Sequence, residues 1–269
     1  MSITVQNLEN INITKIKEAK NRYKLTVITA YDALFAKLFS KNADMILVGD
    51  SLNMSFMGSN DTLSATLEQM IYHTKAVCNG AKNSFIITDM PFGTYINKDE
   101  ALKNCIKIYQ ETKANAVKIE GGEDRADIVK HLTSNSIAVM GHIGLMPQYV
   151  RGEGGYKVRG KTKEDEEQLI RDAIAIEKAG AFSLVIEGVM SDVAKKITQA
   201  ISIPTIGIGA GNETDGQVLV WSDMLGFFEE FKPKFVRHYL NGASLVNKSI
   251  KQYREDVQSQ SFPSKEEEY

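Results

Sequence analysis

Short apolar runs recur along the chain and alternate with longer amphipathic segments. The runs are rich in β-branched and aliphatic residues and end in polar residues or glycine. Strands of a parallel sheet that is covered on both sides have this composition, because neither face of the sheet meets water. Eight runs fit the description: Leu25–Ala30, Met45–Val48, Phe85–Thr88, Ala116–Ile119, Ile137–Met140, Ser183–Ile186, Thr205–Ile208 and Gln217–Val220.

The segments between these runs have helical periodicity. Thr66 is a suitable N-cap for one of them, and Gly80 and Gly180 are natural helix stops. Strands that alternate with helices favour a single-domain (β/α)8 TIM barrel, and a doubly wound parallel sheet is the alternative that this pattern leaves open. The expected helices are Ile13–Lys20, Thr66–Asn79, Asp99–Thr112, Asp124–Thr133, Glu164–Ala179, Asp192–Ala200 and Gly242–Val257.

The length of the chain and the lack of interior linkers indicate one domain. The chain has 269 residues, and a barrel of this kind takes about 250. We expect the barrel domain to span residues 1–257, including the N-terminal helix, and Gln258–Tyr269 to form a mobile tail. The stretch His142–Lys163 is rich in glycine and charge, and we expect it to form a loop or lid over one end of the barrel.

Composition narrows the functional class. The formal net charge is −2, with 32 basic and 34 acidic residues, and this balance argues against nucleic-acid and membrane-surface proteins, which present a basic face. Cys78 and Cys105 have neither disulfide nor zinc spacing, so we expect reduced, buried thiols and a cytoplasmic setting. The first twenty residues have no secretory pattern, and no run approaches the roughly 20 apolar residues of a spanning helix.

Polar residues stand at or just after the ends of five consecutive apolar runs. In a parallel barrel these positions share the carboxyl-terminal end, where active sites are built. We therefore expect one pocket to collect Asp50, Ser51, Asp89, Lys118, Glu120, His142 and Glu187.

Each of these residues also has a plain structural interpretation. An Asp after a strand is commonly a turn or capping residue. Lys118 could simply neutralise Glu120, because residues i and i+2 of a strand point to the same side. His142 could be hydrogen-bonded scaffolding. Their placement at one end of successive strands favours a shared chemical role.

Asp50 and Asp89 form the best candidate metal pair. Mg²⁺ prefers oxygen ligands and is commonly held by one or two carboxylates together with water and substrate oxygens. A 2-oxo acid would supply two such oxygens, from its keto and carboxylate groups. Glu120 could bind the metal directly or through water. The absence of a His or Cys cluster in the sequence makes zinc a poorer candidate.

Ten blocks, in order from about Thr29 to Tyr239, closely resemble the ketopantoate hydroxymethyltransferase family. Each block alone is a weak signal, but the ordered set is specific. The blocks are Thr29–Phe39 (TAYDALFAKLF), Val48–Met54 (VGDSLNM), Thr66–Val77 (TLEQMIYHTKAV), Asp89–Tyr95 (DMPFGTY), Val117–Gly122 (VKIEGG), Gly141–Gln148 (GHIGLMPQ), Gly154–Lys161 (GGYKVRGK), Leu184–Val189 (LVIEGV), Pro204–Gly211 (PTIGIGAG) and Asp215–Gly226 (DGQVLVWSDMLG).

The resemblance implies an activity and an assembly. Members of the family transfer the one-carbon unit of 5,10-methylenetetrahydrofolate to 3-methyl-2-oxobutanoate, which gives 2-dehydropantoate and tetrahydrofolate on the route to pantothenate and coenzyme A. The resemblance further implies a TIM barrel of the phosphoenolpyruvate/pyruvate type, one Mg²⁺ per subunit and a homodecamer of two pentameric rings in the cytoplasm.

The same resemblance assigns roles by position. It implies that Asp50 and Asp89 bind the metal and also lie against the oxo acid, and that Glu120 lies near the metal. Ser51, Lys118 and His142 correspond to substrate-binding positions. Glu187 corresponds to the proposed proton acceptor.

Three positions depart from the family pattern. Asn53 stands where the family usually has glycine, Ser64 stands near a usual proline, and Ser222 replaces a usual histidine. None of them is among the residues assigned to chemistry. Two other functions remain open at this point, namely a Mg²⁺-dependent 2-oxo-acid lyase or mutase on a similar barrel, and a non-catalytic barrel that serves binding or assembly.

Overall fold

The computed structural model describes residues 11–229 and 232–269. The chain separates into two compact units, Met1–Val220 and Trp221–Tyr269. The predicted boundary at residue 257 differs from this division, and the extent of the barrel domain and the mobility of the tail stay predictions.

Eight parallel strands close into a barrel in the first unit. They pair in chain order, and β1 also pairs with β8, which closes the ring and rules out a doubly wound sheet. The predicted (β/α)8 barrel is therefore confirmed. The strands are β1 (Leu25–Thr29), β2 (Met45–Val48), β3 (Phe85–Asp89), β4 (Ala116–Glu120), β5 (Val139–Gly144), β6 (Ser183–Glu187), β7 (Thr205–Ile208) and β8 (Gly216–Leu219).

All eight apolar runs correspond to strands, with differences at their ends. Asp89, Glu120 and Glu187 are the last residues of their strands rather than the residues that follow them. The largest difference is in β5, which begins two residues later than predicted and runs on to Gly144, so that His142 lies within the strand.

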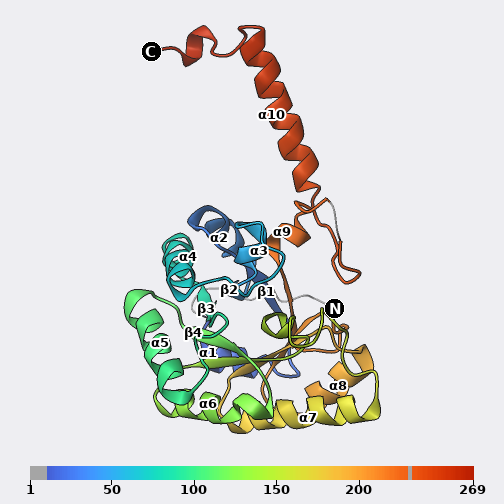
Figure 1. The fold of residues 1–269 in the computed structure, drawn as a ribbon. Helices are drawn as coiled ribbons and strands as arrows, with labels where there is room; N and C mark the ends of the chain where they lie inside the picture. Colours follow the sequence, from blue (N-terminus) through green and yellow to red (C-terminus); the bar gives the residue numbers. More distant parts are fainter. Residues whose placement is uncertain (1–10, 230–231) are drawn as a thin grey trace. The chain divides into compact units, whose positions relative to one another are not determined.

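Helices of the first unit surround the barrel, and α9 and α10 belong to the second unit. Each of the seven predicted helices is present, with ends within two residues of those expected, and Figure 1 shows α4 to α8 following one another around the outside of the sheet. The helices are α1 (Ile13–Glu18), α2 (Ala33–Phe39), α3 (Leu52–Ser55), α4 (Leu67–Gly80), α5 (Lys98–Glu111), α6 (Glu123–Ser134), α7 (Lys163–Lys178), α8 (Ser191–Ala200), α9 (Trp221–Met224) and α10 (Gly242–Gln258).

Helix α2 was not predicted, because its sequence does not read as an amphipathic helix. Asp32 caps it by accepting hydrogen bonds from the main-chain N–H groups of Leu34 and Phe35. Leu34 is 78% exposed, however, and the only buried residue of the helix is Ala36. A helix with its large apolar side chains on the outside lacks the inward apolar stripe that identifies a surface helix.

Glycine ends two helices in different ways. Thr66 caps α4 as predicted and forms a capping box with Gln69. Gly80 is the last residue of α4 rather than a stop after it, and a Cβ there would lie 2.1 Å from the carbonyl oxygen of Ala33 in α2. Close packing of α2 on α4 therefore requires this glycine. Gly180 follows α7 with a φ of +96°, a conformation that favours glycine.

Successive residues of each strand alternate between the inside of the barrel and the surrounding helices. The inward residues nearest the amino ends of the strands are apolar and form one buried cluster with Ile16 of α1 and with Ala19, which follows this helix, so α1 packs at that end. The strands contribute to this inner cluster through Leu25, Val27, Met45, Leu47, Phe85, Ile87, Ala116, Met140, Val185, Ile206, Ile208 and Val218.

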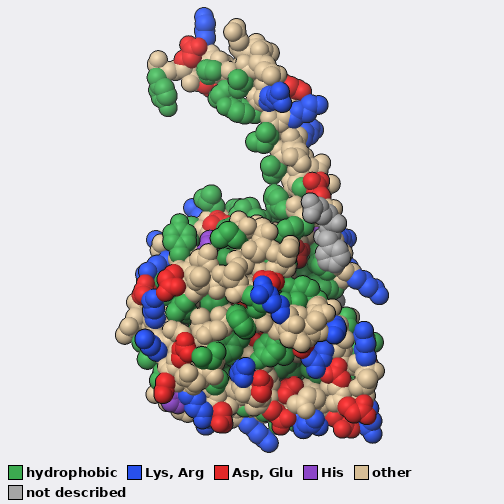
Figure 2. Space-filling model, in the orientation of Figure 1, with side chains coloured by type: hydrophobic (Ala, Val, Ile, Leu, Met, Phe, Trp, Pro, Cys, Tyr) green, Lys and Arg blue, Asp and Glu red, His purple; other side chains and the backbone are tan. Residues whose placement is uncertain are grey.

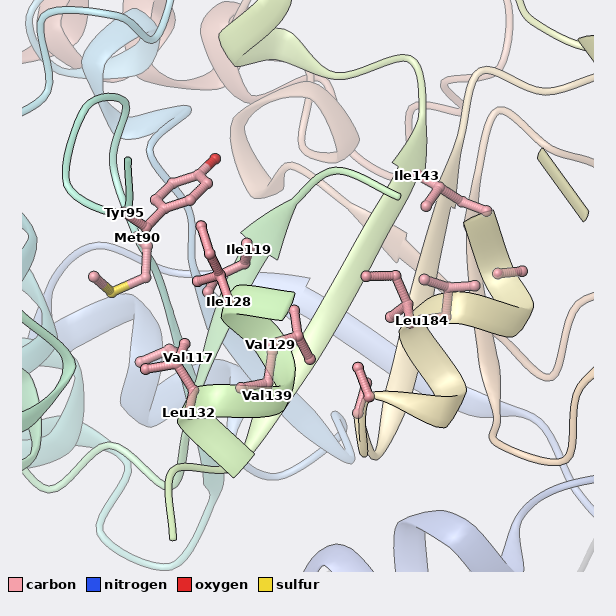
Figure 3. Close-up of a cluster of buried hydrophobic side chains, with 14 of the residues drawn as sticks. Met90, Tyr95, Val117, Ile119, Ile128, Val129, Leu132, Val139, Ile143 and Leu184 are labelled. Atoms are coloured by element: carbon pink, nitrogen blue, oxygen red, sulfur yellow. The ribbon is translucent and has the colours of Figure 1, made fainter. Parts of the chain in front are cut away.

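The outward residues form a second cluster with the helices. Figure 3 shows Ile128 and Leu132 of α6 lying beside Val117 and Ile119 of β4, and all four belong to this cluster. Cys78 and Cys105 are buried free thiols, as predicted. This layer fixes the outer face of each strand, and the inner face is left for the residues described below.

The molecular surface carries both signs of charge. On the face that Figure 2 shows, basic and acidic side chains are interspersed over the barrel unit. Ion pairs among the surface residues of this unit include Lys75 with Glu111 and Lys196 with Glu166. Within the described residues, no helix is both long and apolar enough to span a membrane.

Candidate active site

The residues that point into the barrel are apolar near the amino ends of the strands and charged near their carboxyl ends. Lys118 and Glu120 have the same inward direction as Ala116, His142 follows Met140, and Glu187 follows Val185. The strand register sets Asp89 beside Lys118 and Glu120 beside His142. The predicted charged residues therefore meet in one place.

Lys118 is the centre of this cluster. Its side chain is 5% exposed, and its ammonium nitrogen lies 3.2 Å from Asp89 Oδ1, 3.9 Å from Glu120 Oε1 and 3.0 Å from His142 Nδ1. Burial by itself would lower the pKa of Lys118, but the nearby carboxylates of Asp89, Glu120 and Asp50 outweigh it and raise the pKa above its usual range. Lys118 is therefore a permanent positive charge inside the barrel.

The contacts of His142 define its protonation. Burial, followed by the charge of Lys118, holds the pKa of His142 well below its usual range, so the ring is neutral. A charged lysine can only donate, so Nδ1 of His142 accepts from Lys118 and the proton lies on Nε2. Nε2 faces the carbonyl oxygen of Leu145 at 3.1 Å and Glu187 Oε2 at 3.2 Å. His142 thus connects Lys118 with Glu187.

Glu187 is suited to move a proton near neutral pH. Burial is the largest influence on this carboxyl group and raises its pKa to about 7, while Lys118 acts in the opposite direction. Its side chain is 19% exposed, whereas those of Lys118, Glu120 and His142 are at most 5% exposed. Glu187 is accordingly the member of the cluster that can exchange a proton with solvent.

Asp50 and Asp89 lie against each other. The main-chain N–H of Asp50 donates to Asp89 Oδ2 at 3.1 Å. Burial and the neighbouring Asp89 raise the pKa of Asp50 to about 7. A Cβ at Gly49 would lie 2.8 Å from Ser51 Oγ and 3.5 Å from Asp89 Oδ2, so a glycine before Asp50 keeps room for both side chains.

The donor set fits a hard divalent cation. Within this fully described cluster, Lys118 faces four carboxyl groups, those of Asp50, Asp89, Glu120 and Glu187. Burying carboxylates without compensation is costly, so an additional cation would be stabilised here. Glu120 Oε1 is also buried without a hydrogen-bond partner. The described residues contain no group of three His, Cys, Asp or Glu side chains placed to hold a metal ion. A Mg²⁺ ion commonly takes one or two carboxylates and completes its coordination with oxygens of substrate and water.

Ser51 lies beside the carboxylates and contacts a residue that the sequence did not single out. Its hydroxyl is 2.8 Å from the hydroxyl of Tyr31, whose side chain is fully buried. The carbonyl oxygen of Tyr31 lies 2.6 Å from Nδ1 of His73 in α4. Nothing in the strand or helix pattern marks Tyr31, because it stands in the short connection between β1 and α2.

Gln148 is a second residue that the sequence pattern did not identify. It is 4% exposed, and its side-chain amide donates to Asp50 Oδ2 at 2.8 Å. It lies in a 3-10 turn, Pro147–Tyr149, after β5. A loop has no periodicity from which burial can be inferred, and Pro147 was the only local signal of a turn.

The expected lid over the barrel end is tied down near Glu187. The main chain of Arg159 pairs with the segment after β6, donating to the carbonyl of Gly188 at 2.8 Å and accepting from Met190 at 3.0 Å. The Arg159 guanidinium binds Asp165 and Glu153. This segment is therefore positioned beside the end of β6.

Two of the departures from the family pattern contact each other. Asn53 is buried, and its Nδ2 donates to Ser64 Oγ at 2.8 Å and to the carbonyl of Asp61 at 2.9 Å. The side chain of Asp61 pairs with Arg151 at 3.1 Å. The pair Asn53 and Ser64 therefore organises the loop between α3 and α4. Ser222 is buried in α9, in the second unit.

Solved structures share the barrel. A phosphonopyruvate hydrolase complex with oxalate and Mg²⁺ has a TM-score of 0.61 at 12% identity, with 95% of this chain and 92% of that chain covered. A 2,3-dimethylmalate lyase of the PEP mutase/isocitrate lyase superfamily has a TM-score of 0.56 at 15% identity, with 93% and 87% covered. At such identities the likeness shows the fold alone, a (β/α)8 barrel.

Comparison of the sequence with known proteins finds relatives at much higher identity than these solved structures. A chain from Aliarcobacter butzleri named 3-methyl-2-oxobutanoate hydroxymethyltransferase is 81% identical over 269 residues, with both chains covered in full. Chains of the same name from Sulfurimonas denitrificans and Helicobacter pylori are 66% and 56% identical and cover 95% and 100% of this chain, which covers 97% and 100% of theirs. The family model described as ketopantoate hydroxymethyltransferase matches residues 10–265. The chain therefore belongs to the ketopantoate hydroxymethyltransferase family of enzymes.

Proposed function

We propose that this enzyme transfers the one-carbon unit of 5,10-methylenetetrahydrofolate to C3 of 3-methyl-2-oxobutanoate, with consumption of water, to give 2-dehydropantoate and tetrahydrofolate. The observation that carries the proposal is the polar chain at the barrel end: a charged Lys118, a neutral His142 and Glu187 with a pKa of about 7. A ketone with an adjacent C–H bond needs such a combination of positive charge and base.

The oxo acid would bind at the carboxylate cluster together with Mg²⁺. Asp50 and Asp89 would hold the metal and lie against the substrate, with Glu120 as a direct or water-mediated ligand. A phosphonopyruvate hydrolase with the same barrel was solved with oxalate and Mg²⁺, and this supports pairing the cation with a small anionic ligand. When bound, Mg²⁺ would supply a Lewis acid that withdraws electrons from the keto group.

The residues of the chain then divide the remaining tasks. Glu187 takes the proton from C3 and returns it to solvent, which it reaches through its partly exposed side chain. Lys118 supplies positive charge next to the substrate's anionic oxygens. His142 keeps Nε2 3.2 Å from Glu187 Oε2, and the carbonyl oxygen of Leu145, 3.1 Å from the same nitrogen, orients the ring. Ser51 offers a hydroxyl to the substrate beside Asp50.

Water adds to the methylene carbon of the folate, both C–N bonds break, and the two nitrogens take up protons, so that tetrahydrofolate leaves and the one-carbon unit is at the oxidation level of formaldehyde. The carbanion at C3 then forms a C–C bond to this carbon, and its oxygen, which came from water, takes up a proton and becomes the hydroxyl group of 2-dehydropantoate. The segment Gly152–Lys161 would cover the site during these steps and exclude water from the reacting atoms. The homodecamer with one Mg²⁺ per subunit and the cytoplasmic setting remain part of the proposal on the basis of family membership.

The first test is the reaction itself. The purified protein with Mg²⁺, 3-methyl-2-oxobutanoate and 5,10-methylenetetrahydrofolate should form 2-dehydropantoate and tetrahydrofolate in equal amounts, measured by chromatography. A lyase or mutase would convert a longer oxo acid without folate, and a binding module would convert neither. Folate-independent turnover of the oxo acid would therefore contradict the proposal.

The second test concerns Glu187. Glu187→Gln should fold, bind Mg²⁺ and the oxo acid, and exchange the C3 proton with solvent deuterium about 10²–10⁴-fold more slowly, because a general base typically contributes that much. Proton NMR of the oxo acid in D₂O measures the exchange. Glu111→Gln removes a surface carboxylate that pairs with Lys75 and should exchange at the parent rate. The parent rate in Glu187→Gln would exclude Glu187 as the proton acceptor.

The third test is the pH dependence of the same exchange. Because burial raises the pKa of Glu187 to about 7, its basic form disappears as the pH falls below 7. The exchange rate should be half-maximal near pH 7 and fall about tenfold per pH unit in the acid range. A glutamate at its ordinary pKa, about 4.3, would instead give a flat profile from pH 6 upwards.

The fourth test concerns the metal. Asp50→Asn and Asp89→Asn should each weaken Mg²⁺ binding at least about tenfold, the lower end of the loss seen when outer-shell partners are removed. Calorimetric titration with Mg²⁺ in the presence of the oxo acid measures this affinity. Asp127→Asn, at an exposed carboxylate that pairs with Lys98, is the matched control. Parental affinity in both site variants would refute the metal assignment.

A further inference from the structure

Gln148 connects the loop after β5 to two carboxylates of the site. It is the middle residue of the turn Pro147–Tyr149 and lies 98 positions along the chain from Asp50. The loop leaves β5 at Gly144, whose φ is +99° and whose added Cβ would lie 2.3 Å from the carbonyl oxygen of Glu187. This close approach sends the chain across the barrel end and brings Gln148 to the cluster.

The side chain of Gln148 makes hydrogen bonds at both of its ends. Nε2 donates to Asp50 Oδ2 at 2.8 Å and to the carbonyl oxygen of Met90 at 2.9 Å, and Oε1 accepts from the hydroxyl of Tyr95. Its main-chain N–H donates to Glu120 Oε2 at 3.0 Å. One buried residue therefore binds a carboxylate that follows β2 and another that ends β4.

The hydrogen-bond partners of Gln148 determine which end of its side-chain amide carries the NH₂ group. The Met90 carbonyl can only accept, and so can Asp50 in its ionised form, so both require the NH₂ end of Gln148. The opposite orientation would turn the amide oxygen toward two acceptors and leave them unpaired in a buried site. The amide cannot rotate without losing these bonds, and Tyr95, itself 6% exposed, stabilises the same orientation from the other side.

These hydrogen bonds use one oxygen of the Asp50 carboxylate and one of the Glu120 carboxylate, and they leave the other oxygen of each available. Gln148 engages Oδ2 of Asp50 and Oε2 of Glu120. It does not engage Oδ1 of Asp50 or Oε1 of Glu120, and Glu120 Oε1 is buried without a hydrogen-bond partner. Partners of this kind orient metal-binding carboxylates in many sites and are worth a large part of the affinity.

We propose that Gln148 is a positioning residue, which acts through Asp50 to present the carboxylate oxygens that bind Mg²⁺ and the oxo acid. The proposal rests on the proposed function in that it assigns this cation to the cluster. A purely structural role would be different: Gln148 would then hold the loop in place and affect stability, but not the affinity of the cluster for Mg²⁺.

Side-chain variants can separate these roles, because the main-chain bond to Glu120 survives any substitution except proline. Gln148→Met keeps the approximate size and removes both donors. We expect it to weaken Mg²⁺ binding in the presence of 3-methyl-2-oxobutanoate by about 10–100-fold, measured by calorimetry. Tyr95→Phe is the comparison variant: it removes the other partner of the same amide and leaves the contact with Asp50, so it should weaken Mg²⁺ binding clearly less than Gln148→Met.

A double-mutant cycle tests whether Gln148 acts through Asp50. When Asp50→Asn has already weakened the site, adding Gln148→Met should cause little further loss, whereas independent contributions would add. Thermal unfolding of each variant reports the fold. If Gln148→Met does not fold, Gln148→Glu, which keeps the size and turns an oxygen toward Asp50, takes its place and should lose affinity at least as strongly.

The outcomes separate this inference from the proposed function. Parental Mg²⁺ affinity in the folded Gln148 variant, or an equal loss in Tyr95→Phe, overturns the positioning role, and so does additivity in the cycle. A parent protein with no Mg²⁺ affinity overturns both proposals. A parent that binds Mg²⁺ but forms no 2-dehydropantoate removes the proposed function alone, and the comparison of affinities still decides the role of Gln148.

Discussion

An ammonium group buried among carboxylates is the interaction on which the site depends. Transfer of one such charge out of water costs several kcal/mol, and Lys118 is stable inside the barrel only because Asp89, Glu120 and Asp50 lie around it. The dependence is mutual, since the same carboxyl groups would repel one another without it. Because these residues stand at the ends of β2, β3 and β4, the parallel pairing of these neighbouring strands assembles the charges, and the fold and the site stabilise each other.

The sequence was sufficient to predict the barrel, because parallel strands and their covering helices impose strong periodicities. It was also sufficient to predict which polar residues meet, since alternation along β4 puts Lys118 and Glu120 on the face of Ala116. Strand ends were less predictable. Residues Ile137 and Ala138 have the composition of a strand, yet β5 runs from Val139 through Gly141 to Gly144, because pairing with its neighbours overrides local propensity.

Contacts between distant loops could not be predicted. The hydrogen bond from Gln148 to Asp50 depends on where the chain goes after Gly144, and that path follows from packing against β6 rather than from any local pattern. Asn53 and Ser64 are similar. Each departs from the family pattern when taken alone, and only the folded loop shows that they bond to each other. The neutral state and the tautomer of His142 likewise follow from the residues around it, and the presence of a histidine at this position does not by itself reveal them.

The apolar residues at the amino ends of the strands bear on how ligands enter and leave the barrel. Ile16 of α1 and Ala19, which follows this helix, pack with the inner residues at the amino ends of the strands, so the interior is filled there, as in other barrels of this architecture. Among the described residues, this packing closes the amino end of the interior, so the charged cluster faces the carboxyl end of the barrel. Two ligands that share this end and bind at different depths would have to bind and leave in a fixed order.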